Sequence, residues 1–218
     1  MRVVLGKSVE GRPIEALVLG RAGGRTTLIL GGFHGDEPKG VSIAYRLVEL
    51  LESGGYVVAD LASIIVLVVN PDGFERRKRR NVNGVDINRN FPTRNWQRTV
   101  QRSRMFGGNA AGSEPETRAV IEAVNRYHPT RIISVHSING GRHCNNFDGP
   151  AEAIASMMQR FNGYPVESSI GYPTPGSFGT WAGVERNIPT ITLELPSGHS
   201  TKRCWEENRD ALLAAVLA

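Results

Sequence analysis

Short apolar runs separated by turn-forming residues dominate the chain and predict its strands and helices. Strands buried in a sheet are predicted where these runs are rich in β-branched residues: Thr26–Leu30, Ile64–Val69, Arg131–Val135 and Ile188–Leu195. Val3–Leu5 and Ile14–Leu19, joined by a turn that contains glycine, predict an N-terminal hairpin. Helices are predicted over four further segments: Gly40–Leu51, Ala151–Phe161, Phe178–Arg186 and Thr201–Leu217.

Turn chemistry separates these segments. Asn70-Pro71-Asp72-Gly73 predicts a turn, and residues 74–112 lack a clear period, which predicts a long ordered loop of the kind that carries function. Ser113 and Glu116 form a capping-box pattern that predicts the start of another helix, ending near Tyr127. Because strands alternate with helices, we expect an α/β fold with a mixed sheet covered on both faces, in one domain over residues 1–218.

Composition narrows the class of protein. Of 218 residues, 40% are apolar and 22% are charged, which is typical of a soluble globular protein. The longest apolar run, Ala211–Ala218, is too short to span a bilayer, and the apolar residues after Met1 stop too early for a signal peptide. Since the chain has only Cys144 and Cys204, we expect two reduced thiols in a cytoplasmic protein that binds no membrane.

The positive charge is concentrated in one segment. The chain has a net charge of +5, and residues 73–104 hold ten basic side chains against two acidic ones. The densest part is Arg76-Arg77-Lys78-Arg79-Arg80. A run of this kind binds nucleic acid, binds an anionic substrate or forms a solvated loop, and the charge alone does not choose among them.

Side chains with metal-binding and acid–base chemistry accompany the predicted strands. His34 with Glu37, and separately His136, follow buried strands, and Glu194 lies within one. Ligands bind at the carboxyl ends of strands in open α/β sheets, and two histidines with one glutamate and an open fourth position describe a catalytic zinc site. His-x-x-Glu by itself is a weak signal. Glu194 has two interpretations, a buried acid paired with an arginine or a general base.

Longer motifs occur in an order shared with one enzyme family. They are Gly-Phe-His-Gly-Asp-Glu at 32–37, Asn-Pro-Asp-Gly at 70–73, Asn-Gly-Val-Asp-Ile-Asn-Arg-Asn-Phe-Pro at 83–92, Ser-Glu-Pro-Glu-Thr-Arg-Ala at 113–119, His-Ser at 136–137, Gly-Tyr-Pro-Thr-Pro-Gly-Ser-Phe-Gly-Thr-Trp at 171–181 and Thr-Leu-Glu-Leu-Pro at 192–196. In these motifs the chain resembles the zinc carboxypeptidases of the carboxypeptidase A type, and within them the short bacterial murein peptide amidase A group. The resemblance implies a three-layer α/β/α fold with a central mixed, mostly parallel sheet of about eight strands.

The resemblance also implies the metal site. His34, Glu37 and His136 match the ligands of one zinc ion per chain, and Glu194 matches the catalytic carboxylate. With these four residues in the family's order, we expect a zinc metallopeptidase.

Residues that bind the substrate are implied in the same way. Asn88 and Arg89 match the pair that binds the terminal carboxylate of the substrate, and Tyr172 matches the mobile active-site tyrosine less closely. Family members tune side-chain selection near Phe178, where this chain has no lone acid that would suggest a preference for lysine or arginine.

An arginine upstream of the Asn-Arg-Asn motif polarises the scissile carbonyl in the family. Arg79 has the best spacing for this role, and Arg77 and Arg80 are close competitors. Because Arg79 and Arg89 both lie in the basic segment, an anionic substrate becomes the favoured interpretation of its charge.

The resemblance implies hydrolysis of the γ-D-glutamyl–meso-diaminopimelate bond of murein peptides, with a small anionic cell-wall peptide as the partner. The alternative is a carboxypeptidase that removes C-terminal residues from ordinary α-linked peptides, and a deacylase of the aspartoacylase kind is a third candidate. A basic nucleic-acid-binding module with a decayed metal site is disfavoured, because all three ligands and Glu194 are present and no nucleic-acid motif occurs. The sequence does not indicate an oligomeric state.

Overall fold

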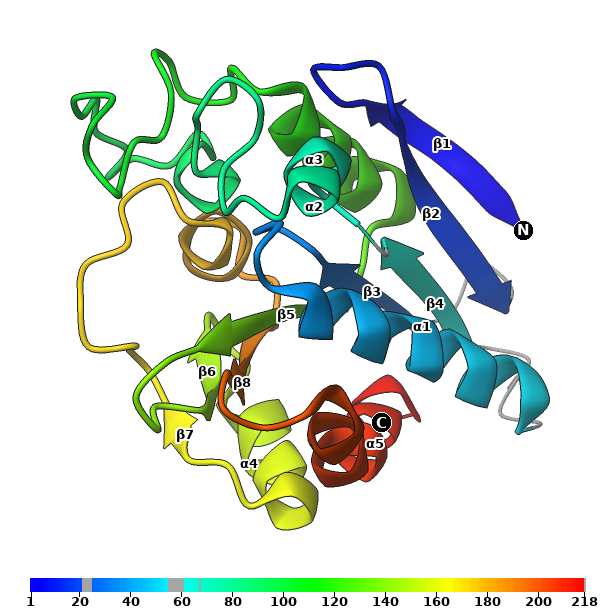
Figure 1. The fold of residues 1–218 in the computed structure, drawn as a ribbon. Helices are drawn as coiled ribbons and strands as arrows, with labels where there is room; N and C mark the ends of the chain where they lie inside the picture. The colour runs from blue at the N-terminus through cyan, green and yellow to red at the C-terminus, as the bar shows by residue number, and fades with distance from the viewer. Residues whose placement is uncertain (21–24, 55–60, 67, 218) are drawn as a thin grey trace.

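The computed structural model describes residues 1–20, 25–54, 61–66 and 68–217, and its centre is one sheet (Figure 1). The sheet has eight strands in the order β1-β2-β4-β3-β5-β8-β6-β7. The elements in chain order are β1 (Arg2–Lys7), β2 (Pro13–Gly20), β3 (Arg25–Gly31), α1 (Pro38–Ser53), β4 (Leu61–Val66), α2 (Pro71–Arg76), η1 (Ile87–Arg89), α3 (Pro115–Tyr127), β5 (Arg131–Ile138), β6 (Cys144–Asp148), α4 (Glu152–Asn162), β7 (Val166–Glu167), η2 (Thr180–Val184), β8 (Thr190–Pro196) and α5 (Thr201–Leu217).

The sheet is mixed, with its parallel part in the middle. β4, β3, β5 and β8 run parallel to one another. The hairpin β1–β2 adds to one side through antiparallel pairs, and β6 pairs antiparallel with β8 on the other. The predictions of an N-terminal hairpin and of a mixed α/β sheet are therefore confirmed.

Apolar side chains fill both faces of the sheet, because successive residues of a strand point to opposite sides. In β3, Ile29 packs with α1, α4 and α5 on one face, whereas Leu28 and Leu30 pack with α3 and with Trp181 on the other. Figure 1 shows these helices lying on the two sides of the strands. The three-layer arrangement follows from this double burial, which explains why the central strands are almost continuously apolar.

The structure corrects several predicted boundaries. The strand predicted at 64–69 is β4 at 61–66, and residue 67 lies outside the described residues. β5 does not end before His136 but continues to Ile138, because it pairs with β8 as far as Pro196. The helix predicted over 178–186 is shorter, with η2 forming a π-helical turn at Thr180–Val184. β6 and β7 were not predicted.

Two predictions of local chemistry are wrong. Asn70–Gly73 is not a free turn but the start of α2, because the side chain of Asn70 caps Gly73 N at 2.9 Å and Pro71 occupies the first turn. The capping box of Ser113 and Glu116 does not form. Ser113 Oγ instead donates to Glu114, and the Glu116 carboxylate accepts from Asn81. The predicted loop at 74–112 is otherwise confirmed, since it contains only the end of α2 and the short η1.

Candidate active site

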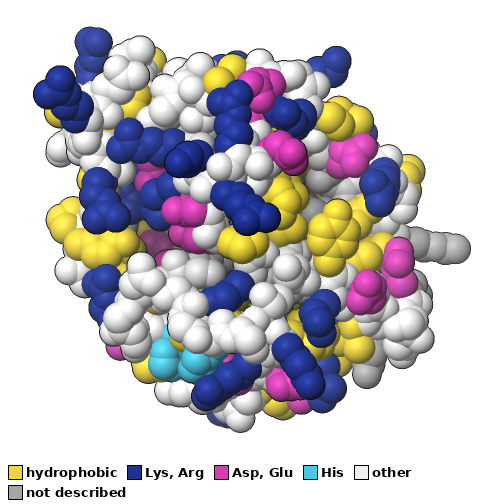
Figure 2. All heavy atoms as spheres, viewed as in Figure 1, with side chains coloured by type: hydrophobic (Ala, Val, Ile, Leu, Met, Phe, Trp, Pro, Cys, Tyr) yellow, Lys and Arg dark blue, Asp and Glu magenta, His cyan; other side chains and the backbone are white. Residues whose placement is uncertain are grey.

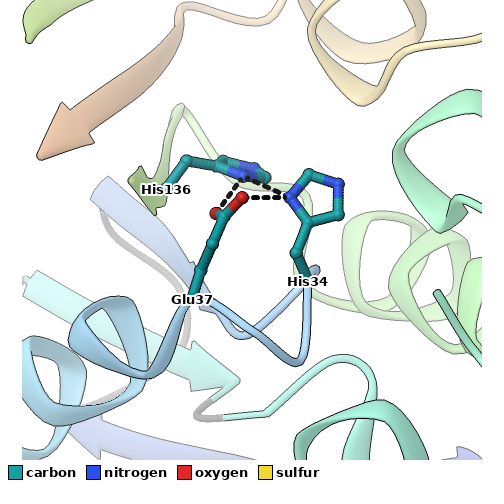
Figure 3. Close-up of side chains that lie close together, drawn as sticks. All are labelled: His34, Glu37 and His136. Atoms are coloured by element: carbon teal, nitrogen blue, oxygen red, sulfur yellow. Dashed lines mark hydrogen bonds and ion pairs between the residues drawn. The ribbon is translucent and has the colours of Figure 1, made fainter. Parts of the chain in front are cut away.

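Three side chains converge at the carboxyl ends of β3 and β5. His34 Nδ1 lies 2.7 Å from Glu37 Oε1, and His136 Nδ1 lies 3.1 Å from Glu37 Oε2 (Figure 3). The two imidazole Nδ1 atoms are 3.2 Å apart. Potential ligand atoms of all three residues lie within 4.8 Å of one another, in a largely buried setting. The predicted cluster of His34, Glu37 and His136 therefore forms.

The backbone brings these residues together by close packing. His34 follows β3, Glu37 is the residue before α1, and His136 lies in β5 next to β3. A Cβ atom on Gly40 would lie 2.6 Å from the carbonyl oxygen of Val135, so only glycine lets α1 approach β5 this closely. Gly40 thus sets the distance between Glu37 and His136.

Asp86 holds the first histidine of the cluster and was not singled out from the sequence. His34 Nε2 donates to Asp86 Oδ1 at 3.0 Å, so its Nδ1 faces Glu37 and His136. Burial would lower the pKa of His34, but the charges of Glu37 and Asp86 outweigh it and raise the pKa to about 9. The sequence signal that could have identified Asp86 is that it is one of only two acids in the basic segment, residues 73–104.

The second histidine is oriented by an aromatic ring. Phe33 stacks on His136 with ring centroids 5.4 Å apart and an angle of 19° between the planes. Beside it, the backbone N–H of Ser137 donates to Glu37 Oε2 at 3.0 Å. The cluster is therefore held by ring packing, by a backbone donor and by Asp86, which is the kind of outer support that fixes metal ligands.

Glu194 lies next to His136 on the neighbouring strand. The two residues are directly opposite each other in the parallel pair β5–β8, and Glu194 is 7% exposed. In the part of the chain that the structure describes, no group donates a hydrogen bond to its carboxylate. Burial is the main cause that raises the pKa of Glu194, against the opposing charge of His136. Its interpretation as an acid paired with an arginine is wrong, because the described residues give it no ion-pair partner.

Of the three candidate arginines, the structure brings Arg79 into the cluster. Its Nε donates to Asp86 Oδ2 at 3.1 Å and its Nη1 to Glu37 Oε1 at 3.2 Å. Arg80 instead donates to backbone carbonyls, including that of Gly84 at 3.2 Å. Arg77 is exposed at the end of α2. Of these three arginines, Arg79 is therefore the one that lines the cleft.

Asn88 and Arg89 lie on the same cleft as the cluster, in η1. Asn88 Oδ1 accepts from the backbone N–H of Phe178 at 2.9 Å, which fixes the amide. Arg89 is 4% exposed, and its buried Nε has no partner among the described residues. A buried guanidinium nitrogen without a partner is the kind of donor that a bound carboxylate can satisfy.

The cleft has a volume of about 550 Å³ and contains all eight predicted site residues. Tyr172 stands at its rim with 40% of its surface exposed. Asp148, at the end of β6, also lines the cleft, and burial alone raises its pKa to about 6. The sequence around Phe178 contains no lone acid, but the structure places Asp148, from a different strand, next to Gly179. A role of Asp148 in side-chain selection stays a prediction.

The donor set fits zinc. Two imidazole nitrogens and a carboxylate, all close together, leave room for the fourth position that a catalytic zinc site keeps open. An α/β sheet with this cluster at its strand ends, and a further buried carboxylate beside it, has the architecture of a metal-dependent hydrolase.

Comparison with known proteins identifies the family. The family model of the zinc carboxypeptidases matches residues 1–210, and the chain belongs to this family of zinc metallopeptidases. Murein peptide amidase A of Escherichia coli strain K12 is 36% identical over 209 residues, which are 88% of this chain and 79% of that protein. Murein peptide amidase A of Vibrio campbellii is 33% identical over 226 residues, covering 97% and 85% of the two chains.

A solved structure supports the same fold. The crystal structure of murein-tripeptide amidase MpaA from Escherichia coli O157 matches with a TM-score of 0.81 at 29% identity, covering 100% of this chain and 92% of that one. The zinc carboxypeptidase-like fold implied by the sequence motifs is thereby confirmed. No helix among the described residues is long and apolar enough to cross a membrane.

Proposed function

We propose that residues 1–218 form a single catalytic domain that hydrolyses the γ-D-glutamyl–meso-diaminopimelate bond of murein peptides. The observation that carries the proposal is the charge of the cleft. It holds Arg89 for a terminal carboxylate and Asp148 for an ammonium group, beside the metal cluster. Diaminopimelate, as the leaving group, presents both a free carboxylate and an amine. The similarity to murein peptide amidases supports the same substrate class.

The metal ligands in this proposal are His34, Glu37 and His136. Zinc held there would lower the pKa of a water molecule toward neutrality and polarise the scissile carbonyl. Glu194 accepts the proton of the attacking water and then delivers it to the leaving amine. Because burial raises the pKa of Glu194, it is a stronger base than an exposed glutamate.

Arg79 stabilises the negative charge that develops on the carbonyl oxygen. Its guanidinium is already held by Asp86 and Glu37, so it needs little reorganisation during the reaction. A positioned donor of this kind is commonly worth about 3–4 kcal/mol in the transition state.

The leaving group binds on the wall formed by η1 and the segment before η2. Arg89 binds its free carboxylate, Asn88 adds a hydrogen bond and Tyr172 closes the rim. Asp148 binds the amine at the far end of the diaminopimelate side chain, where a cation compensates the burial of the carboxylate. A cytoplasmic location is part of the proposal and accords with Cys144 and Cys204, both free and buried.

The runner-up is a carboxypeptidase acting on ordinary α-linked peptides, and one experiment separates the two. The zinc-loaded protein is incubated with L-Ala-γ-D-Glu-meso-diaminopimelate and with a panel of α-linked tripeptides, and the released amino acids are identified by mass spectrometry. We expect release of diaminopimelate, with Glu194→Gln as the inactive control. Cleavage of the α-linked panel without release of diaminopimelate would establish the carboxypeptidase instead.

A further inference from the structure

The arginines of the cleft differ in whether they are paired with a carboxylate of the protein. Arg79 is already paired with Asp86 and Glu37. Arg104 and Arg142 also line the cleft and are exposed, and neither has a hydrogen bond or ion pair to the part of the chain that the structure describes. In Figure 2, Lys and Arg side chains are spread over the face in view, with several at its upper left, where Figure 1 shows the loops. A cation of the cleft that pairs with no carboxylate of the protein is available to an anionic ligand.

The register of β6 against β8 places Arg142 and Asp148 on opposite sides of Glu194. Cys144 lies directly opposite Glu194, and Asp148 lies opposite Thr190. Four residues of strand span about 13 Å, so Asp148 is about that far along the strand from the level of Glu194. Arg142 precedes Cys144 and therefore lies beyond the other end of this strand.

Contacts of the segment before η2 identify the leaving-group side. The backbone N–H of Phe178 donates to Asn88 Oδ1, and a Cβ atom on Gly179 would lie only 2.1 Å from Asp148 Oδ2. Asn88 and Asp148 thus flank the same short segment. Since the carboxylate clamp of Asn88 holds the leaving group under the proposed function, Arg142 lies toward the acyl side of the scissile bond.

We propose that Arg142 binds a free carboxylate on the acyl side of the scissile bond and so selects peptides whose acyl residue is joined through its side chain. The inference rests on the proposed function. A γ-linked glutamyl residue keeps its α-carboxylate free, next to the carbonyl that is attacked. An α-linked residue uses that carboxyl group in the scissile bond itself, so its main chain offers Arg142 no anion.

The test compares two tripeptides that differ in one group. L-Ala-γ-D-Glu-meso-diaminopimelate is compared with the same peptide bearing an α-carboxamide on the glutamyl residue, using kcat/KM of the zinc-loaded enzyme. The wild type should prefer the acid by about tenfold, the size of one charged hydrogen bond at an exposed site. Arg142→Gln should bring the acid-to-amide ratio to within about twofold of unity, and Arg142→Lys should retain part of it because the charge is kept.

Two matched variants control for the general field of the basic cleft. Arg104→Gln removes another unpaired cleft cation, and Arg102→Gln removes an exposed cation of the same loop that does not line the cleft. Both should keep the wild-type ratio. A ratio unchanged in Arg142→Gln, or lowered equally in Arg104→Gln, would overturn the assignment. If the wild type cleaves both peptides equally, only this inference fails; if it cleaves neither, the proposed function fails and the inference falls with it.

Discussion

Replacement of Asp148 by asparagine tests whether ionisation of this carboxyl group destabilises the folded protein until a cationic ligand binds. Burial raises the pKa of Asp148 from 3.8 to about 6, and no described group donates a hydrogen bond to its carboxylate. Each pKa unit corresponds to about 1.4 kcal/mol. The shift of about two units therefore costs the folded state about 3 kcal/mol once the carboxyl is ionised.

The pH dependence of this cost has a definite sign. The unfolded chain releases the Asp148 proton near pH 3.8, whereas the folded chain keeps it until about pH 6. The cost is therefore absent below pH 3.8, grows between pH 4 and pH 6, and is complete above pH 6. Asp148→Asn should raise the free energy of unfolding by up to about 3 kcal/mol at pH 7.5 and by little at pH 4.

Urea denaturation of the metal-free protein at pH 4, 5, 6 and 7.5 measures this difference, with chelator at every pH so that loss of metal does not contribute. In the zinc-loaded enzyme at pH 7.5, the same variant should raise KM for a substrate with a free side-chain amine more than for its N-acetylated form. A variant that is no more stable than the wild type at pH 7.5, or that is equally stabilised at pH 4, would refute the reasoning.

Further predictions concern the metal cluster and the clamp. His136→Ala should contain much less zinc by metal analysis at neutral pH, and full zinc content would remove His136 from the site. Glu194→Gln should keep the fold and the zinc but lose about 10²–10⁴-fold in kcat, since an amide cannot take a proton; turnover near wild type would mean that another residue is the base. Arg89→Lys should raise KM far more for free-acid substrates than for their C-terminal amides, because lysine lacks the guanidinium fork, and equal effects on both would exclude the clamp. Zinc binding should release a proton from His34, whose pKa is raised to about 9 without metal. The apparent affinity for zinc, measured by chelator competition, should therefore rise between pH 6 and pH 9, and an affinity that does not change with pH would contradict this.

The strands and helices with strong periodicity were predictable, and the weakly patterned ones were not. β3 and α1 have apolar residues at the spacing that their burial requires, so the sequence indicates both. β6 is Cys-Asn-Asn-Phe-Asp, which has low strand propensity, and it is a strand because it pairs with β8 along its length. Whether such a segment forms a strand depends on its tertiary pairing, which no local sequence pattern indicates.

The residues of the site divide in the same way into those that the sequence predicts and those that only the tertiary structure places. His34, Glu37 and His136 could be predicted because their motifs accompany buried strands, and parallel strands bring their carboxyl ends to one edge. Asp86 contacts His34 across 52 residues of sequence, and its role depends on the path of a loop that has no period. From the sequence, Asp148 either touches the substrate or merely folds the loop after His136, and only the tertiary structure shows that it lies in β6 and lines the cleft.

The unpaired charges of the cleft favour a murein-type substrate over an ordinary peptide. Asp86 and Glu37 are compensated within the protein by His34 and Arg79, so they need no cation from the substrate. Asp148 has no such partner, and its ionised form destabilises the folded chain until a cation binds. An α-linked peptide with an apolar C-terminal residue would satisfy the clamp and leave that cost in place. A γ-glutamyl–diaminopimelate peptide brings an amine to Asp148 and carboxylates to Arg89 and Arg142, so its binding offsets charges that the fold leaves uncompensated.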